Sequence, residues 1–152
     1  QRFRAVIMHS GIPPGTAHSR LSALGAMHGH RDPRPLPSSA GETDTRWPPL
    51  LVIHGDMDTV VSPRNGHAAA QIWAHAAGAR ASSPRSIQRG RRYPMSVTDF
   101  KRQGRTVATL VTVNGLAHAW SGGAKQAFSD GQGPDASRMA WSFAARQFRS
   151  EV

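Results

Sequence analysis

The chain contains no cysteine, which excludes disulfides and thiolate-bound metal sites but leaves its cellular compartment open. It also lacks an apolar stretch of membrane-spanning length, so we expect no membrane span. A phosphate-binding Gly-x-x-x-x-Gly-Lys-Ser/Thr loop and internal repeats are absent as well. The 152 residues, 38% of them hydrophobic, suit one domain, residues 1–152, with a hydrophobic core.

Lysine is scarce too, although the formal net charge is +10. Lys101 and Lys125 are the only lysines among the 19 basic residues, and five arginines gather between residues 80 and 92. Such a segment could neutralise phosphates, but it belongs to no recognisable nucleic-acid-binding module and has no interleaved aromatic side chains for stacking on bases. We therefore interpret it as a solvated basic loop and expect no nucleic-acid partner.

The eight histidines raise the question of a metal site. His28 and His30 lie two residues apart, a spacing that places them on opposite sides of a helix. We interpret both as surface or loop histidines, and we expect neither a metal nor another cofactor.

Apolar runs alternate with helical patterns along the chain, which indicates the α/β fold class. Residues 50–53 are the clearest buried strand, because an unbroken apolar run suits a parallel strand covered on both faces. Residues 31–49 are rich in Pro, Ser, Gly and charge, and predict a surface loop. The other expected strands are 3–8, 93–100 and 106–113, and the expected helices are 17–27, 63–78 and 134–148.

Two of the strands end in turns that carry a titratable side chain. The run that begins at Leu50 leads to Asp58, and the run that ends at Val113 leads to His118. An acid followed by a histidine, each just after a strand, is the order of the last two members of a Ser-Asp-His triad in α/β-hydrolases. Asp56 is the alternative acid, although an aspartate just after a strand often caps backbone amides in its turn. We favour Asp58 because the register of the His-Gly-x-x-Asp-x-x-Val motif at 54–61 selects this position.

The nucleophile is missing from this pattern, because the chain contains no Gly-x-Ser-x-Gly elbow. The nearest match surrounds Ser121, but it follows the acid and the base instead of preceding them. Ser10 follows an apolar strand but has no glycine two positions before it, so we interpret it as a residue of the cleft wall. Trp73 and Trp120 are candidates for an apolar cleft wall that binds substrate, with ordinary core packing as the alternative.

Three blocks of sequence resemble the C-terminal part of polyhydroxybutyrate depolymerase-type esterases. They are a strand that ends in His-Ser-Gly at 6–11, a His-Gly-x-x-Asp-x-x-Val turn at 54–61, and Gly-Leu-x-His-x-Trp-x-Gly-Gly at 115–123. The resemblance implies an α/β-hydrolase fold, with a mostly parallel sheet flanked by helices in three layers. It also implies that Asp58 and His118 are the acid and base of a serine esterase.

The same resemblance places the nucleophile and the oxyanion loop before Gln1, so the chain would be the C-terminal portion of the enzyme and inactive alone. Its substrate would be a polyhydroxyalkanoate or another polyester, or a short-chain, acetylxylan or feruloyl ester, and a secreted or periplasmic location would fit the family. A non-catalytic binding domain on a hydrolase scaffold remains the alternative function. The strand at 3–8 would have an exposed edge, through which we expect the chain to form a homo-oligomer.

Overall fold

The computed structural model describes residues 3–38, 47–124 and 126–149. The centre of the predicted loop, residues 39–46, therefore lies outside the described residues. The strands are β1 (Val6–His9), β2 (Leu50–Gly55), β3 (Arg80–Ala81), β4 (Arg85–Ile87), β5 (Met95–Arg102), β6 (Arg105–Val113), β7 (Trp120–Ser121) and β8 (Ser129–Asp130). The helices are α1 (Arg20–Met27), α2 (Arg64–Ala77) and α3 (Ala136–Arg149).

The main sheet is mixed, with strands in the order β1-β2-β6-β5-β3 and with β4 also paired to β5. The pairs β1–β2 and β2–β6 are parallel, whereas β5 is antiparallel to β6, β3 and β4. The expected α/β class is confirmed, but the sheet is less parallel than predicted. The reason is local, because the short turn at Gln103 and Gly104, both with positive φ, folds β5 and β6 into a hairpin.

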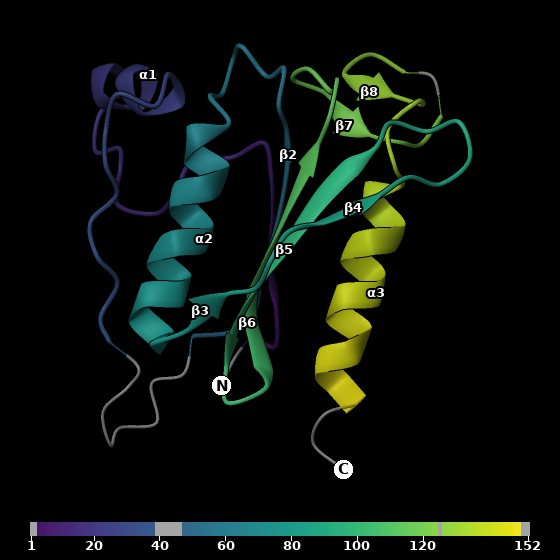
Figure 1. The fold of residues 1–152 in the computed structure, drawn as a ribbon. Helices are drawn as coiled ribbons and strands as arrows, with labels where there is room; N and C mark the ends of the chain where they lie inside the picture. The colour runs from purple at the N-terminus through teal and green to yellow at the C-terminus, as the bar shows by residue number, and fades with distance from the viewer. Residues whose placement is uncertain (1–2, 39–46, 125, 150–152) are drawn as a thin grey trace.

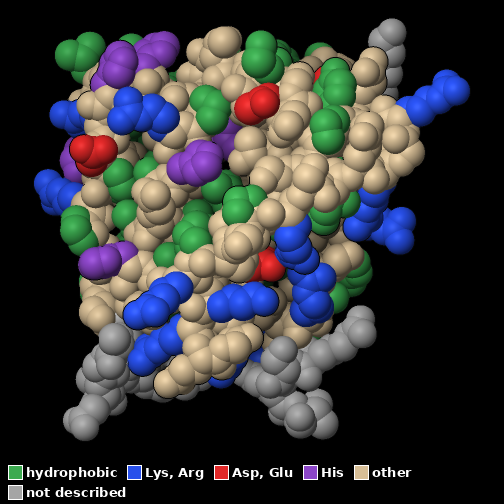
Figure 2. Space-filling view, in the orientation of Figure 1, with side chains coloured by type: hydrophobic (Ala, Val, Ile, Leu, Met, Phe, Trp, Pro, Cys, Tyr) green, Lys and Arg blue, Asp and Glu red, His purple; other side chains and the backbone are tan. Residues whose placement is uncertain are grey.

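The basic segment is only partly the loop that its composition predicts, because Arg89, Arg91 and Arg92 lie outside any strand whereas Arg80 and Arg85 do not. Residues 80–81 and 85–87 form two short antiparallel strands on β5. Arg85 also forms an ion pair with Asp99 of β5, with 2.8 Å between Nη2 and Oδ2. On the face shown in Figure 2, Lys and Arg side chains gather mainly over the lower half of the molecule.

Helices cover both faces of the sheet, with α2 on one side and α3 on the other (Figure 1). Alternate residues of β2 supply the two cores, because successive side chains of a strand point to opposite faces. Leu50 and Val52 pack with α2, whereas Leu51 and Ile53 pack with the side chains of α3. Burying each of these side chains stabilises the fold by about 1.5–3 kcal/mol, which explains why this strand is apolar throughout.

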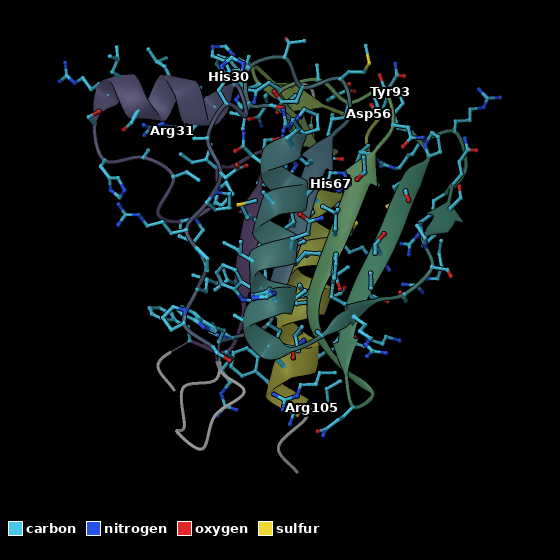
Figure 3. All side chains as sticks on the ribbon, turned by 60° about the vertical axis from the view of Figure 1, so that its left-hand side comes forward. His30, Arg31, Asp56, His67, Tyr93 and Arg105 are labelled. Carbon is cyan, nitrogen blue, oxygen red and sulfur yellow. The ribbon has the colours of Figure 1, made fainter. Side chains whose placement is uncertain are left out.

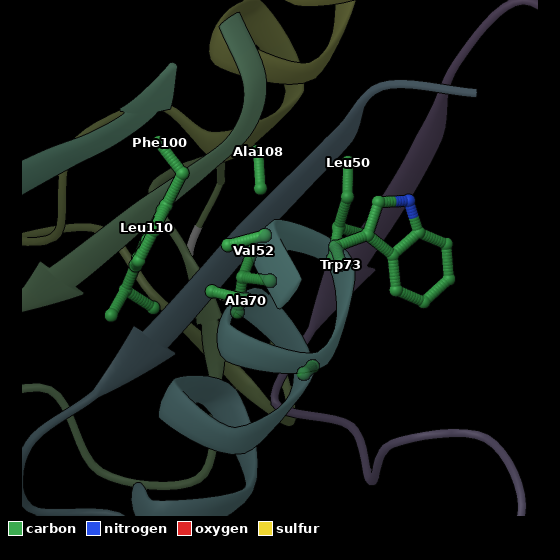
Figure 4. Close-up of a cluster of buried hydrophobic side chains, with 9 residues drawn as sticks. Leu50, Val52, Ala70, Trp73, Phe100, Ala108 and Leu110 are labelled. Carbon is green, nitrogen blue, oxygen red and sulfur yellow. The ribbon is translucent and has the colours of Figure 1, made fainter. Parts of the chain in front are cut away.

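Trp73 belongs to the core under α2 (Figure 4). It is 7% exposed, and its indole N–H donates a hydrogen bond of 2.9 Å to the carbonyl oxygen of Pro48, just before β2 begins. The interpretation of Trp73 as a residue of the substrate cleft is therefore corrected to core packing.

The parallel strands β1, β2 and β6 end together at the upper end of the sheet. Asp56, just after β2, lies at this end, whereas Arg105, the first residue of β6, lies at the opposite end (Figure 3). No helix in the described part of the chain is both long enough and apolar enough to cross a membrane.

Candidate active site

The acid turn and the base turn lie side by side because β2 and β6 are parallel neighbours in register. Gly55, the last residue of β2, pairs with Val113, the last residue of β6. Beyond this pair, the N–H of Met57 donates to the carbonyl oxygen of Leu116, with 3.1 Å between the two atoms. Gly55 is required here, because a Cβ at this position would collide with the backbone carbonyl of Leu116.

Asp58 and His118 meet across these turns. Oδ2 of Asp58 lies 2.9 Å from Nδ1 of His118, although the two residues are 60 positions apart in the sequence. The other carboxylate oxygen accepts the N–H groups of Val60 at 3.0 Å and Val61 at 2.8 Å. The Asp58 side chain is completely buried, whereas that of His118 is 37% exposed.

The electrostatics of the pair suit an acid that orients a base. Burial alone would raise the pKa of Asp58, but the hydrogen bonds from His118 and from the Val61 and Val60 amides outweigh it and hold the pKa below its ordinary value. The ionised carboxylate accepts a hydrogen bond from the N–H at Nδ1 of His118, which leaves the lone pair of the neutral imidazole on Nε2. Among the described residues, none forms a hydrogen bond with this Nε2.

Asp56 has a different task in the same turn. Its Oδ1 accepts the N–H of Gly115 at 2.7 Å, and its own N–H donates to the carbonyl oxygen of Val113 at 3.1 Å. Asp56 therefore ties the two turns together, while Asp58 contacts the imidazole. This is the division that the motif register predicts.

His54, the residue before Gly55 in β2, contacts two residues of the acid turn. Its Nε2 lies 2.9 Å from the carbonyl oxygen of Val61 and 3.4 Å from Oδ2 of Asp58. Burial lowers the pKa of His54, so the ring is neutral and Nε2 donates its proton toward both oxygens. The sequence contained the signal, because His54 opens the His-Gly-x-x-Asp motif, but a supporting role was not predicted.

The two serines considered as nucleophiles are placed differently. Ser121 is fully buried, and its hydroxyl donates a hydrogen bond of 2.6 Å to the carbonyl oxygen of Pro134. The hydroxyl proton is therefore not directed toward His118. Ser10 follows β1 with a φ of 48°, a strained conformation of the kind often found at functional sites. Its Oγ is buried without a hydrogen-bond partner among the described residues, so the structure does not join Ser10 to His118.

Trp120 and His9 form an aromatic pair beside the base. Their rings are stacked with centroids 4.6 Å apart and planes inclined by 20°. Trp120 is 40% exposed, as a cleft-wall residue would be, and its neighbour Ser121 donates its backbone N–H to Nε2 of His9 at 3.2 Å. His9 was not predicted as a site residue, although it stands in the His-Ser-Gly block.

No arrangement of three or more His, Asp or Glu side chains suited to a metal ion occurs within the described ranges. The described residues line several hollows elsewhere in the fold. Two of them, of about 410 and 290 Å³, adjoin α2, and a third, of about 620 Å³, lies between α3 and the sheet. None of these three is lined by Asp58 or His118.

The stability of the chain should fall as the pH drops from 6.5 toward 4, in part because native His9 resists protonation. Burial and the nearby His54 lower the pKa of His9 from 6.5 to about 4. Between these values the unfolded state binds more protons than the folded state, so acid favours unfolding. Urea denaturation at a series of pH values measures the free energy of unfolding, which should vary less with pH in His9→Phe than in the unmodified chain. Part of the pH dependence left in the variant should come from His54, whose pKa is also lowered by burial. An unchanged pH dependence in the variant would show that the ring is not held neutral.

No protein-family model matches the chain, and no curated protein matches it significantly. The function is therefore inferred from the geometry of Asp58, His118 and the residues around them.

Proposed function

We propose that the chain supplies the acid and base of a Ser-Asp-His esterase of the α/β-hydrolase type, similar to polyhydroxybutyrate depolymerases. The observation that carries the proposal is the contact between buried Asp58 and half-exposed His118, with 2.9 Å between Oδ2 and Nδ1. In such a pair the histidine takes a proton from the serine through Nε2 and later activates water, while the aspartate fixes the tautomer and stabilises the imidazolium.

The nucleophile of this mechanism would stand on a strand beside β1. Strand β1 is the edge strand of the described sheet, with β2 as its neighbour on one side. A further parallel strand on its other side would end close to Ser10 and His9, at the same end of the sheet as His118. A serine just after such a strand would face Nε2 of His118, so the position supports acyl transfer at this end of the sheet.

The test is the coding sequence upstream of Gln1. A Gly-x-Ser-x-Gly elbow after an apolar strand is expected there, and the longer protein should hydrolyse p-nitrophenyl butyrate in a manner abolished by His118→Ala. A longer protein with no such elbow, or with activity that persists in His118→Ala, would instead favour a non-catalytic binding domain or an unrelated mechanism.

The isolated 152 residues should not hydrolyse p-nitrophenyl butyrate above a boiled control. Neither candidate serine is hydrogen-bonded to His118, because the Ser121 hydroxyl donates to the carbonyl oxygen of Pro134 and Ser10 Oγ has no hydrogen-bond partner among the described residues. A spectrophotometric assay at high protein concentration checks this. Turnover that disappears in His118→Ala would contradict the prediction, and separate Ser10→Ala and Ser121→Ala variants would then identify the nucleophile.

We also expect the isolated chain to associate through the open edge of β1. Unpaired backbone groups on an edge strand favour pairing with another strand, and Ile7 in β1 and Phe3 before it are 38% and 69% exposed. Light scattering at micromolar concentration should give a dimer or a larger species, and Ile7→Lys should shift it toward the monomer. A monodisperse monomer of the unmodified chain would count against this interface.

A further inference from the structure

His9 lies at the end of β1, where its ring is held from two sides. One face stacks on Trp120, with 4.6 Å between centroids, and Nε2 accepts the N–H of Ser121 at 3.2 Å. Both partners belong to the segment just after His118, so the ring connects the end of β1 to the base turn.

The hydrogen bond from Ser121 defines the protonation state of His9. A backbone N–H can be donated only to a nitrogen that has a lone pair, so Nε2 carries no proton. The ring is then neutral, and its single proton is on Nδ1. Burial of the ring, together with the nearby His54, lowers the pKa of His9 to about 4, so this state persists at neutral pH.

The N–H at Nδ1 of His9 is free to bind a ligand. Among the described residues, the buried side-chain atoms without a hydrogen-bond partner are Ser10 Oγ and His54 Nδ1, and Nδ1 of His9 is not one of them. Within the described ranges Nδ1 of His9 also has no hydrogen-bond partner, so protein atoms do not enclose it completely. Trp120 beside it is 40% exposed. The pair therefore combines an apolar ring surface with one neutral hydrogen-bond donor.

We propose that His9 and Trp120 form a subsite that binds the uncharged carbonyl of an ester, with Nδ1–H of His9 as the donor and the indole of Trp120 against the alkyl chain. The proposal rests on the esterase function and specifies what that site binds. The neutral N–H can donate to an ester carbonyl without a charge being taken out of water, whereas a carboxylate would lose part of its hydration without gaining a positively charged partner. The ionised Asp58 close to this ring also disfavours an anion. The subsite thus favours the ester substrate over the acid product.

The test uses NMR spectroscopy of the isolated chain labelled with ¹⁵N in its histidines, so no nucleophile is required. Nitrogen shifts should place the proton of His9 on Nδ1 and keep the ring neutral between pH 5.5 and 8, on the basis of a pKa of about 4. Titration with methyl butyrate should shift the Nδ1 resonance, and sodium butyrate should bind at least about fivefold more weakly, because its charge loses hydration without gaining a positively charged partner. A proton on Nε2, a charged ring at pH 6 within the range of an ordinary histidine, or equal binding of the two probes would overturn the proposal.

Variants separate the donor from the ring. His9→Phe keeps an aromatic ring against Trp120 but removes the donor, so methyl butyrate should bind about two- to tenfold more weakly. His9→Asn places an amide N–H near the position of Nδ1 and should recover part of the loss. His75→Phe, the same change at an exposed histidine of α2, is the matched control and should leave binding unchanged.

Equal binding by His9→Phe and the unmodified chain would refute the subsite even if the longer protein is a serine esterase. Conversely, ester binding at His9 without any serine-dependent hydrolysis in the longer protein would leave the subsite standing and refute the esterase.

Discussion

If a longer protein supplies the proposed nucleophile serine, replacement of Asp58 by Asn should lower its turnover by about 10⁴, the loss seen when the acid of a trypsin-type triad is changed in this way. The carbonyl oxygen of Asn can still accept the amides of Val60 and Val61, so the turn should remain folded. The amide nitrogen, however, would face Nδ1 of His118 in place of a carboxylate oxygen. The imidazole would then favour the tautomer with its proton on Nε2, which cannot accept a proton from serine.

Asp56→Asn is the matched control, because Asp56 lies in the same turn but contacts the N–H of Gly115 and not the imidazole. Its carbonyl oxygen can keep that bond, so turnover should be nearly unchanged and stability should fall by at most about 1 kcal/mol. The measurements are hydrolysis of p-nitrophenyl butyrate and the melting temperature of each variant. Equal losses of turnover from the two substitutions, or a larger loss at Asp56 with an unchanged melting temperature, would overturn the assignment of Asp58 as the acid.

Gly55→Ala should destabilise the fold by about 3 kcal/mol, the upper part of the range for overpacked interiors. The added Cβ would collide with the backbone carbonyl oxygen of Leu116 and lie 2.7 Å from its carbonyl carbon. Backbone atoms cannot rotate away as a flexible side chain can, so the acid turn and the base turn must separate. The hydrogen bond from Met57 to Leu116 would be strained, and the contact between Asp58 and His118 would open with it.

Gly25→Ala in α1 is the control for this substitution. A Cβ at Gly25 would lie 3.7 Å from the nearest atom, in the side chain of Arg31, which is an ordinary contact distance. Alanine in a helix is favoured over glycine by about 1 kcal/mol, so this variant should be as stable as the unmodified chain or slightly more stable. Urea denaturation followed by circular dichroism compares the two. A Gly55→Ala variant with unchanged stability would show that the two turns are not packed as closely as described.

Several elements of the fold could be predicted from local sequence because their signals are strong within a few residues. The run from Leu50 to Ile53 is a buried strand with parallel neighbours on both sides, as its unbroken apolar character predicts. Helix α2 begins after Pro63, and Gly78 follows its last turn with a φ of 63°, as the two breaker residues predict.

The short strands β3 and β4 could not be predicted in the same way. They contain two and three residues, and most of these are exposed. Their composition is that of a basic loop, and only backbone hydrogen bonding to β5 makes them strands. Pairing of this kind depends on a distant partner, so local propensity does not reveal it.

The sequence by itself determined the class of the fold and the identity of the residues in the two turns, because hydrophobic periodicity and motif spacing are local properties. Only the tertiary structure decided which side chains meet. Because β2 and β6 are parallel and in register, Asp58 forms a hydrogen bond with His118, and Asp56 accepts a hydrogen bond from the N–H of Gly115. At the end of β1, His9 stacks on Trp120. At the opposite end of the sheet, Trp73 of α2 lies in the core and donates a hydrogen bond to Pro48, just before β2. These contacts join residues far apart in the chain, and their geometry depends on the strand order and register of the whole sheet.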